Sequence, residues 1–132
     1  MTYTGSCLCG GVEFRLAGPL EPIQICHCGQ CRKAQGTAFV TNIPVAAAAF
    51  QLVAGEALLT RYVSSPDKTR VFCSQCGSPV YSQRDAAPDT LRVRAGLIDG
   101  PLDVRLSSHA YTASKADWWT ITDNLPQSPG PR

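Results

Sequence analysis

The chain has 132 residues, which favours a single domain large enough to bury its own hydrophobic core. Hydrophobic residues make up 44% of it and charged residues 17%, a composition that excludes an intrinsically disordered chain. A membrane-spanning helix needs about 20 consecutive apolar residues, and no run in this sequence approaches that length. The net charge is only +2 and the basic residues are scattered, so we expect neither a nucleic acid nor a membrane as partner.

The residue pattern along the chain predicts many short β-strands separated by turns that contain glycine and proline. The expected strands are residues 12–16, 23–25, 38–43, 58–63, 68–72, 79–82, 91–95 and 109–112. Residues 58–63 and 68–72 flank a Ser-Ser-Pro-Asp turn and are expected to form a hairpin. A helical turn is expected over 45–50, after Pro44, and a plain turn over 98–101.

These elements predict a mostly β fold in which short strands form packed antiparallel sheets, with at most one or two helical turns. We expect one domain over residues 1–125. Residues 126–132 are rich in proline and are expected to form a flexible tail. The first residues show no basic region followed by an apolar run, so we expect no secretory signal and a cytoplasmic location.

Seven cysteines dominate the chemistry that the sequence offers: Cys7, Cys9, Cys26, Cys28, Cys31, Cys73 and Cys76. An odd number of cysteines without a secretory signal argues against a disulfide framework. They fall instead into three tight groups with the spacings CxC, CxCxxC and CxxC. Zinc binding explains these spacings, because a tetrahedral ion with Zn–S bonds of about 2.3 Å accepts sulfurs from one tight turn. A redox dithiol at Cys73 and Cys76, inert buried thiols and an iron–sulfur cluster are weaker interpretations.

The seven thiols divide naturally into a set of three and a set of four. Cys26, Cys28 and Cys31 are close enough in sequence to hold one ion alone, which leaves the first and last pairs for a second ion. Four thiolates make a closed structural site, whereas three leave a position open for an exchangeable ligand, as in catalytic zinc sites. The spacing by itself leaves this division open. It also leaves open whether His27 joins the smaller set, although on an extended chain its side chain would point away from those of its two neighbours.

Longer stretches around the cysteines resemble a known family. They are Gly5-Ser-Cys-Leu-Cys-Gly-Gly-Val12, Cys26-His-Cys-Gly-Gln-Cys-Arg-Lys33, Arg70-Val-Phe-Cys-Ser-Gln-Cys-Gly-Ser78 and His109-Ala-Tyr, followed by Ser114-Lys-Ala-Asp-Trp-Trp and Asp123-Asn-Leu-Pro126. Together they are similar to the glutathione-dependent formaldehyde-activating enzyme family, also called the S-(hydroxymethyl)glutathione synthase or centromere protein V family. The resemblance covers nearly the whole chain.

The resemblance implies a β-tent fold that binds two zinc ions. The implied ligands of a structural zinc are Cys7, Cys9, Cys73 and Cys76, and those around a second, functional zinc are Cys26, Cys28 and Cys31. The resemblance also implies a carbon–sulfur lyase that condenses glutathione, or a similar thiol, with formaldehyde or a related small aldehyde. The partners would then be a small-molecule thiol and an aldehyde, and we expect a monomer or a homodimer.

Other side chains are candidates for contacts with the substrates. Arg32 and Lys33 directly follow Cys31, where they could offset the charge of the thiolates or bind a glutathione carboxylate. His109 or Tyr111 could donate a proton to the alkoxide that forms from the aldehyde. Two other functions stay open: a glutathione carrier or sensor that exchanges zinc for the thiol, and a non-catalytic structural zinc module that binds other proteins.

Overall fold

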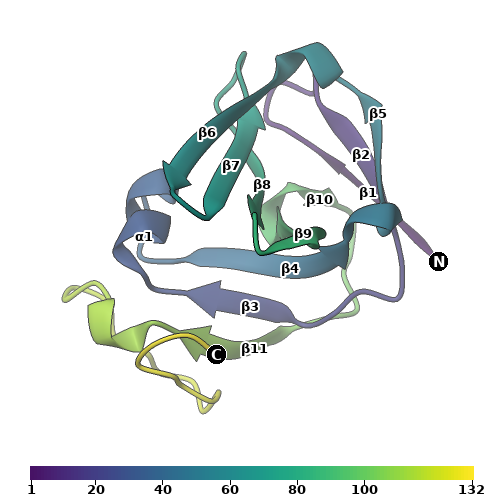
Figure 1. The fold of residues 1–132 in the computed structure, drawn as a ribbon. Coiled ribbons are helices and arrows are strands. Elements are labelled where there is room, and N and C mark those ends of the chain that lie inside the picture. Colours follow the sequence, from purple (N-terminus) through teal and green to yellow (C-terminus); the bar gives the residue numbers. More distant parts are fainter.

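The computed structural model describes residues 1–132 and shows a mostly β protein (Figure 1). The strands are β1 (Thr2–Ser6), β2 (Glu13–Ala17), β3 (Ile23–Cys26), β4 (Val40–Ala46), β5 (Phe50–Ala54), β6 (Leu59–Ser65), β7 (Lys68–Cys73), β8 (Pro79–Arg84), β9 (Ala87–Arg94), β10 (Ile98–Asp99) and β11 (Leu106–Ala110). The helical elements are the α-helix α1 (Gly29–Gln35) and the 3-10 turns η1 (Ala47–Ala49), η2 (Glu56–Leu58), η3 (Ala95–Leu97) and η4 (Thr112–Ser114). No helix is long and apolar enough to cross a membrane.

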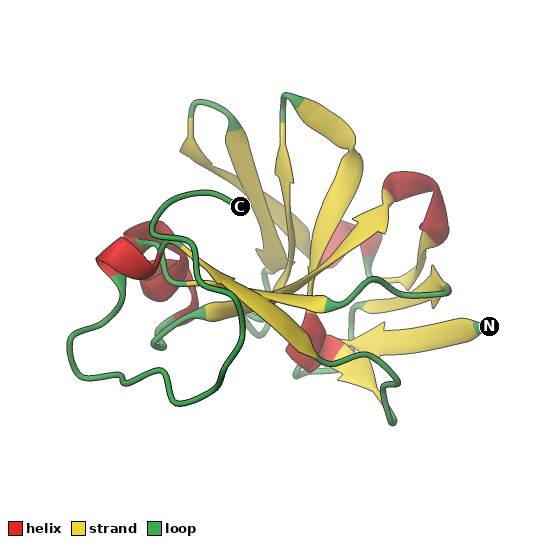
Figure 2. Cartoon of the chain, turned by 90° about the horizontal axis from the view of Figure 1, so that it is seen from below, coloured by secondary structure: helices red, strands yellow, loops and turns green.

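The strands form two sheets, one of four strands in the order β10-β1-β2-β5 and one of seven in the order β11-β3-β4-β9-β8-β7-β6. All neighbouring strands are antiparallel except β11 and β3, which run parallel. The view from below shows the strands gathered in the centre and the long C-terminal loop on one side of them (Figure 2). The predicted mostly β fold of packed, largely antiparallel sheets is therefore confirmed.

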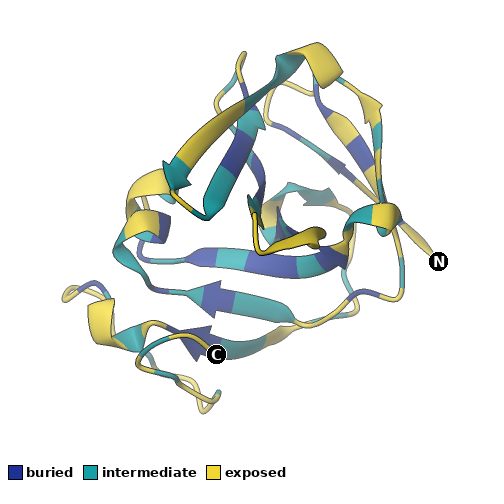
Figure 3. Cartoon of the chain, in the orientation of Figure 1, coloured by how far each residue is buried: buried dark blue, intermediate teal, exposed yellow.

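The hydrophobic core lies between the two sheets and follows the alternation of the strands. In β2, Phe14 and Leu16 are buried whereas the residues beside them are exposed, as the two-residue period of a strand requires. Their partners in the core include Ile43 of β4 and Val93 of β9. Figure 3 shows buried positions along the central strands and exposed ones along β6. Burial of each large apolar side chain contributes roughly 1.5–3 kcal/mol, so this face holds the two sheets together.

Two local expectations fail because long-range pairing decides the backbone. The helical turn begins only at Ala47, since β4 continues through Pro44 to Ala46 in register with β9. The strand accommodates Pro44 because the fixed φ of proline is compatible with extended backbone. Residues 98–101 are not a plain turn: Ile98 and Asp99 form β10, which pairs with β1, and the chain turns after them at Gly100, where φ is 82°.

The helix α1 places two of the cysteines. Cys28 lies just before it in extended conformation, and its side chain accepts a hydrogen bond from the Cys31 N–H, as an N-cap residue does. Gly36 ends the helix in the left-handed region, with φ 67°, and its N–H donates to the Arg32 carbonyl. The sequence pattern did not single out this helix, since Cys31 is its only buried residue and an apolar face is therefore missing.

The residues whose composition predicts a flexible tail lie along β11. The His109 N–H donates to the Pro126 carbonyl at 2.9 Å, and the Ser128 N–H donates to the His109 carbonyl at 2.9 Å. Further on, the Arg132 Nη2 atom donates to the Ile25 carbonyl of β3 at 2.7 Å. Backbone hydrogen bonding, which composition does not reveal, thus attaches this segment to the edge of the larger sheet.

Candidate metal centres and the adjoining bowl

Four thiols meet where the turn after β1 approaches the turn between β7 and β8. Their sulfur atoms all lie within 4.8 Å of one another, and they belong to Cys7, Cys9, Cys73 and Cys76. The Cys7 and Cys9 Sγ atoms are 3.5 Å apart, and the Cys9 and Cys73 Sγ atoms are 3.8 Å apart. Sulfurs around a tetrahedral zinc lie about 3.8 Å apart, given Zn–S bonds of about 2.3 Å. Both the donor set and its geometry therefore fit a zinc ion.

The backbone around this four-cysteine centre is arranged to stabilise thiolates. The Val12 N–H donates to the Cys7 Sγ atom at 3.2 Å, and the Gly11 N–H donates to the Cys9 Sγ atom at 3.4 Å. Hydrogen bonding with the side chain and backbone of Ser78 lowers the pKa of Cys76 to about 5. Because such bonds favour the charged form of sulfur, they prepare the cluster for a cation.

The other three thiols form a second cluster where β3 runs into α1. The sulfurs of Cys26, Cys28 and Cys31 lie within 4.8 Å of one another, with 3.5 Å between the first and the last. Hydrogen bonds with the other two thiols, and then one from Arg70, lower the pKa of Cys31 below that of a free thiol. Three such sulfurs fit a metal ion with a fourth position left for another ligand. The structure thus brings the cysteines together as the four-plus-three division predicts.

The three-cysteine centre opens onto a cavity of about 540 Å³, which we call the bowl. The bowl is lined by Gln24, Cys26, Cys31, Asn42, Ser65, Asp67, Lys68, Arg84, Arg92, Ala110, Tyr111, Pro131 and Arg132. Four of these side chains are cationic and one, Asp67, is a carboxylate. Asp67 already forms an ion pair with Arg84, with 2.8 Å between its Oδ2 atom and the Arg84 Nη2 atom. Burial lowers the pKa of the Lys68 ammonium, and the neighbouring Cys31 thiolate opposes this shift. An anionic small molecule is therefore the ligand that the bowl favours.

The cations predicted from the sequence lie elsewhere. Neither Arg32 nor Lys33 lines the bowl, and Lys33 lines a second cavity of about 520 Å³ between α1 and the strands β6 to β9. Sequence reasoning missed Lys68 and Arg92, which do line the bowl. Arg92 alternates with apolar residues in β9, as solvent-facing residues of any strand do, and Lys68 lies between Asp67 and Thr69 at the start of β7, so no local signal distinguishes either of them.

The two candidate proton donors have different surroundings. His109 is buried, 3% exposed, and both of its ring nitrogens are occupied by protein partners. Tyr111 lines the bowl instead. Its φ is 57°, in the left-handed region that residues other than glycine seldom adopt, and its N–H is held by the Gly130 carbonyl at 2.9 Å. Strained backbone of this kind often occurs at functional sites.

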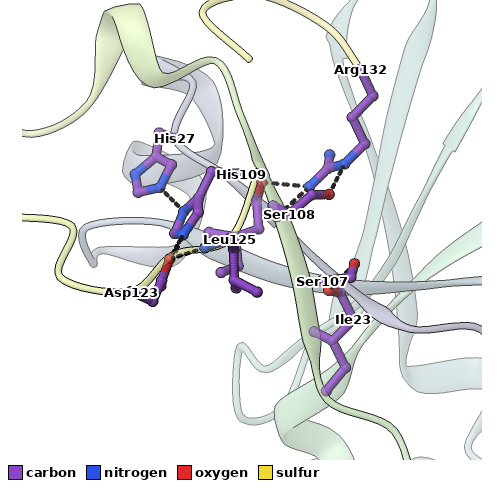
Figure 4. A network of polar contacts seen from close by, with 9 residues as sticks. Ile23, His27, Ser107, Ser108, His109, Asp123, Leu125 and Arg132 are labelled. Atoms are coloured by element: carbon purple, nitrogen blue, oxygen red, sulfur yellow. Dashed lines mark hydrogen bonds and ion pairs between the residues drawn. The ribbon is translucent and has the colours of Figure 1, made fainter. Parts of the chain in front are cut away.

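A chain of polar side chains links the segment that carries the three cysteines to the C-terminal part of the protein; its histidines, His27 and His109, are buried, and Asp123 is exposed (Figure 4). The Asp123 carboxylate accepts from the His109 Nε2 atom at 3.0 Å, which leaves the His109 Nδ1 atom to accept from the His27 Nε2 atom at 2.8 Å. The backbone N–H of Leu125, and then His109, lower the pKa of Asp123. His27 is fully buried and contributes no nitrogen to the cluster of sulfurs. It therefore ties the segment between Cys26 and Cys28 to the C-terminal part of the chain.

Comparison with known proteins places this arrangement in a family. The family described as glutathione-dependent formaldehyde-activating enzyme matches residues 2–114. A Halomonas elongata protein, whose name assigns it provisionally to that activity, is 32% identical over 130 residues, covering 92% of this chain and 82% of its own. An uncharacterised lyase of Schizosaccharomyces pombe is 23% identical over 125 residues, covering 92% of this chain and 86% of its own.

One solved structure adds evidence on the fold. The crystal structure of a Rhodobacter sphaeroides protein superposes with a TM-score of 0.63 at 23% identity, covering 79% of this chain and 99% of that chain. It supports the architecture of two packed sheets and nothing about chemistry. The sequence match over most of the chain carries the assignment: the protein belongs to the glutathione-dependent formaldehyde-activating enzyme family.

Proposed function

We propose that the protein is a zinc-dependent enzyme of the carbon–sulfur lyase type that condenses glutathione with formaldehyde. The observation that carries this proposal is the three-cysteine centre, which opens onto a cationic bowl and lies apart from a closed four-cysteine centre. A structural zinc module would need only the four-cysteine centre. Seven free cysteines also require a reducing compartment, which supports a cytoplasmic location.

The two centres have different roles in this proposal. Cys7, Cys9, Cys73 and Cys76 hold a structural zinc, and Cys26, Cys28 and Cys31 hold a functional one. The functional ion supplies a position at which a substrate thiol is held as its thiolate, which matters because a free thiol with a pKa near 8.5 is mostly protonated at neutral pH.

The bowl binds and orients the rest of glutathione, which carries two carboxylates. Lys68 and Arg92 make no ion pair within the protein, so their charges are free for these carboxylates. Arg84 is committed to Asp67, and the Arg132 guanidinium is committed to Ser108 and to the Ile25 carbonyl. The position of the cations relative to Cys26 and Cys31 then places the glutathione sulfur at the three-cysteine centre.

The reaction forms one carbon–sulfur bond. The glutathione sulfur adds its electron pair to the formaldehyde carbon, and the π electrons of the carbonyl move to its oxygen. That oxygen takes a proton, and the proton lost by the thiol goes to water, so that atoms and charge balance. Tyr111 is the residue that we propose as proton donor, because it lines the bowl whereas His109 is buried and fully engaged.

Native mass spectrometry with and without excess glutathione tests the proposal. We expect two zinc ions per chain, and a protein–zinc–glutathione adduct when the thiol is added. Loss of one of the two zinc ions on addition would instead identify a carrier or sensor that exchanges metal for glutathione. One zinc ion throughout, with no adduct, would contradict the proposal and leave a structural module.

Substitution of the bowl cations tests how the substrate is recognised. Lys68→Met and Arg92→Gln are each expected to raise the KM for glutathione about tenfold, since a charge-assisted hydrogen bond contributes roughly 1.5–3 kcal/mol. Both should change the rate with 2-mercaptoethanol, a thiol without carboxylates, much less than they change the KM for glutathione. Arg61→Gln is the matched control, because Arg61 is an exposed cation on β6 outside the bowl. Equal effects on both thiols would show that these residues act on the fold and not on the substrate.

A further inference from the structure

Two arginines are buried in this protein without any carboxylate partner. Arg70 is 8% exposed and Arg94 is 3% exposed, while the ion pairs of the chain join other residues, Arg84 with Asp67 and His109 with Asp123. A buried cation is costly unless an anion or a full set of hydrogen bonds compensates it. The compensation of each arginine therefore has to be found among its neighbours.

Arg94 is compensated by neutral acceptors. Its Nε atom donates to the Gln35 side chain at 3.1 Å, and its Nη1 atom donates to the side chains of Asn42 and Ser82 and to the Arg92 carbonyl. Burial lowers the pKa of Arg94 to about 10, which leaves it protonated at neutral pH. With these acceptors, no buried nitrogen of the Arg94 side chain is left without a partner.

Arg70 lacks such a set of acceptors. Its Nε atom donates to the Ser64 hydroxyl at 3.1 Å, its Nη2 atom lies 3.8 Å from the Cys31 Sγ atom, and its Nη1 atom has no partner although it is buried. It makes no other hydrogen bond, so the anionic partner that this guanidinium contacts is a sulfur of the three-cysteine centre.

The charge of that centre is the one that a buried guanidinium requires. Three thiolates around a divalent ion leave one negative charge, and a substrate thiolate as fourth ligand raises it to two. An uncompensated dianion in the protein interior would be unstable, which would disfavour the thiolate and favour a neutral ligand such as water. Lys68 and Arg94 act on Cys31 through the electrostatic field, and Arg70 is the cation that donates a hydrogen bond to its sulfur, so Arg70 reduces this penalty most directly.

We propose that Arg70 is the resident counter-cation of the three-cysteine centre and favours an anionic thiolate as its fourth ligand. This inference rests on the metal-holding role proposed above for Cys26, Cys28 and Cys31. Arg70 lines the second cavity and not the bowl, so it lies behind the cluster and does not contact glutathione. It is a positioning residue that acts through Cys31, and Ser64 holds its side chain in place.

Thiolate binding to the cobalt-substituted protein tests this role. Co²⁺ in the three-cysteine centre reports each added thiolate by a thiolate-to-metal absorption band, and 2-mercaptoethanol serves as probe because it cannot use the bowl cations. We expect Arg70→Gln to weaken 2-mercaptoethanol binding about tenfold and to raise the pH of half-maximal binding by about one unit, since one pH unit corresponds to a tenfold change in thiolate. Arg70→Lys keeps the charge and should restore most of the affinity.

The controls separate this inference from the proposed function. Arg61→Gln removes an exposed charge from the neighbouring strand and should bind the thiol as the parent protein does. If the parent protein takes up no second metal ion, the proposed function itself fails. If it takes up two and Arg70→Gln binds the thiol with unchanged affinity and pH profile, only the role of Arg70 is overturned.

A milder variant keeps the test decisive if Arg70→Gln does not fold. Ser64→Ala removes the hydrogen bond that holds the Arg70 Nε atom, together with a long one of 3.5 Å from the Ser64 hydroxyl to the Lys68 carbonyl. It should weaken 2-mercaptoethanol binding about two- to threefold in the same direction, as expected for loss of a single neutral hydrogen bond. A folded Ser64→Ala protein with unchanged thiol affinity and pH profile would then overturn the inference.

Discussion

Replacing Cys76 with serine is expected to remove the four-cysteine centre and to leave the chain largely unfolded. This centre joins the turn after β1 in the small sheet to the turn after β7 in the large one, so its loss separates the two halves of the core. Structural zinc contributes roughly 10–16 kcal/mol in small zinc domains, whereas a typical domain has a net stability of about 5–15 kcal/mol. Losing the centre is therefore enough to shift the equilibrium towards the unfolded state.

Thermal unfolding and metal analysis of purified Cys76→Ser check this expectation. The variant should bind less than one zinc ion tightly and should show no cooperative transition in the range where the parent protein unfolds. Gln75→Ala is the matched control, since Gln75 is exposed in the same turn and contributes no ligand. A Cys76→Ser protein that unfolds at the parent temperature would show that the centre has no structural role.

Replacing Cys28 with serine is expected to abolish catalysis and to preserve the fold. Cys28 caps α1 through a hydrogen bond from the Cys31 N–H, and serine is among the best residues for that position. The variant thus keeps the helix and loses only a thiolate of the three-cysteine centre. Mutating a residue that only hydrogen-bonds to a metal ligand typically lowers metal affinity or activity about 10–100-fold. Loss of a ligand itself should therefore reduce the rate at least about a hundredfold, to the uncatalysed background.

The rate of S-(hydroxymethyl)glutathione formation, together with zinc content and the unfolding temperature, checks this second expectation. Cys28→Ser should retain one zinc ion per chain and unfold close to the parent temperature. Gln30→Ala, an exposed change in the first turn of α1, serves as the control for effects on the helix. Full activity in the serine variant would rule out a catalytic role for the three-cysteine centre.

The features that the sequence predicted correctly depend on neighbours along the chain. The alternation of β2 and the β6–β7 hairpin are local patterns, and both form where they were expected. The cysteines could be grouped because CxC, CxCxxC and CxxC each deliver sulfurs from one turn, so spacing alone limits which of them can share an ion. The same spacings, with their flanking residues, were sufficient to indicate the family.

The substrate side of the site was decided by the tertiary structure. Arg70 reaches Cys31, and Lys68 and Arg92 converge on the bowl, only because β7, β8 and β9 are neighbours in one sheet, which brings together residues that no local pattern connects. For the same reason His27 meets His109, 82 positions later, and β10 pairs with β1. Local spacing indicated which cysteines of this protein cluster, whereas long-range strand pairing, which follows from burial of the core, determined which charges surround them.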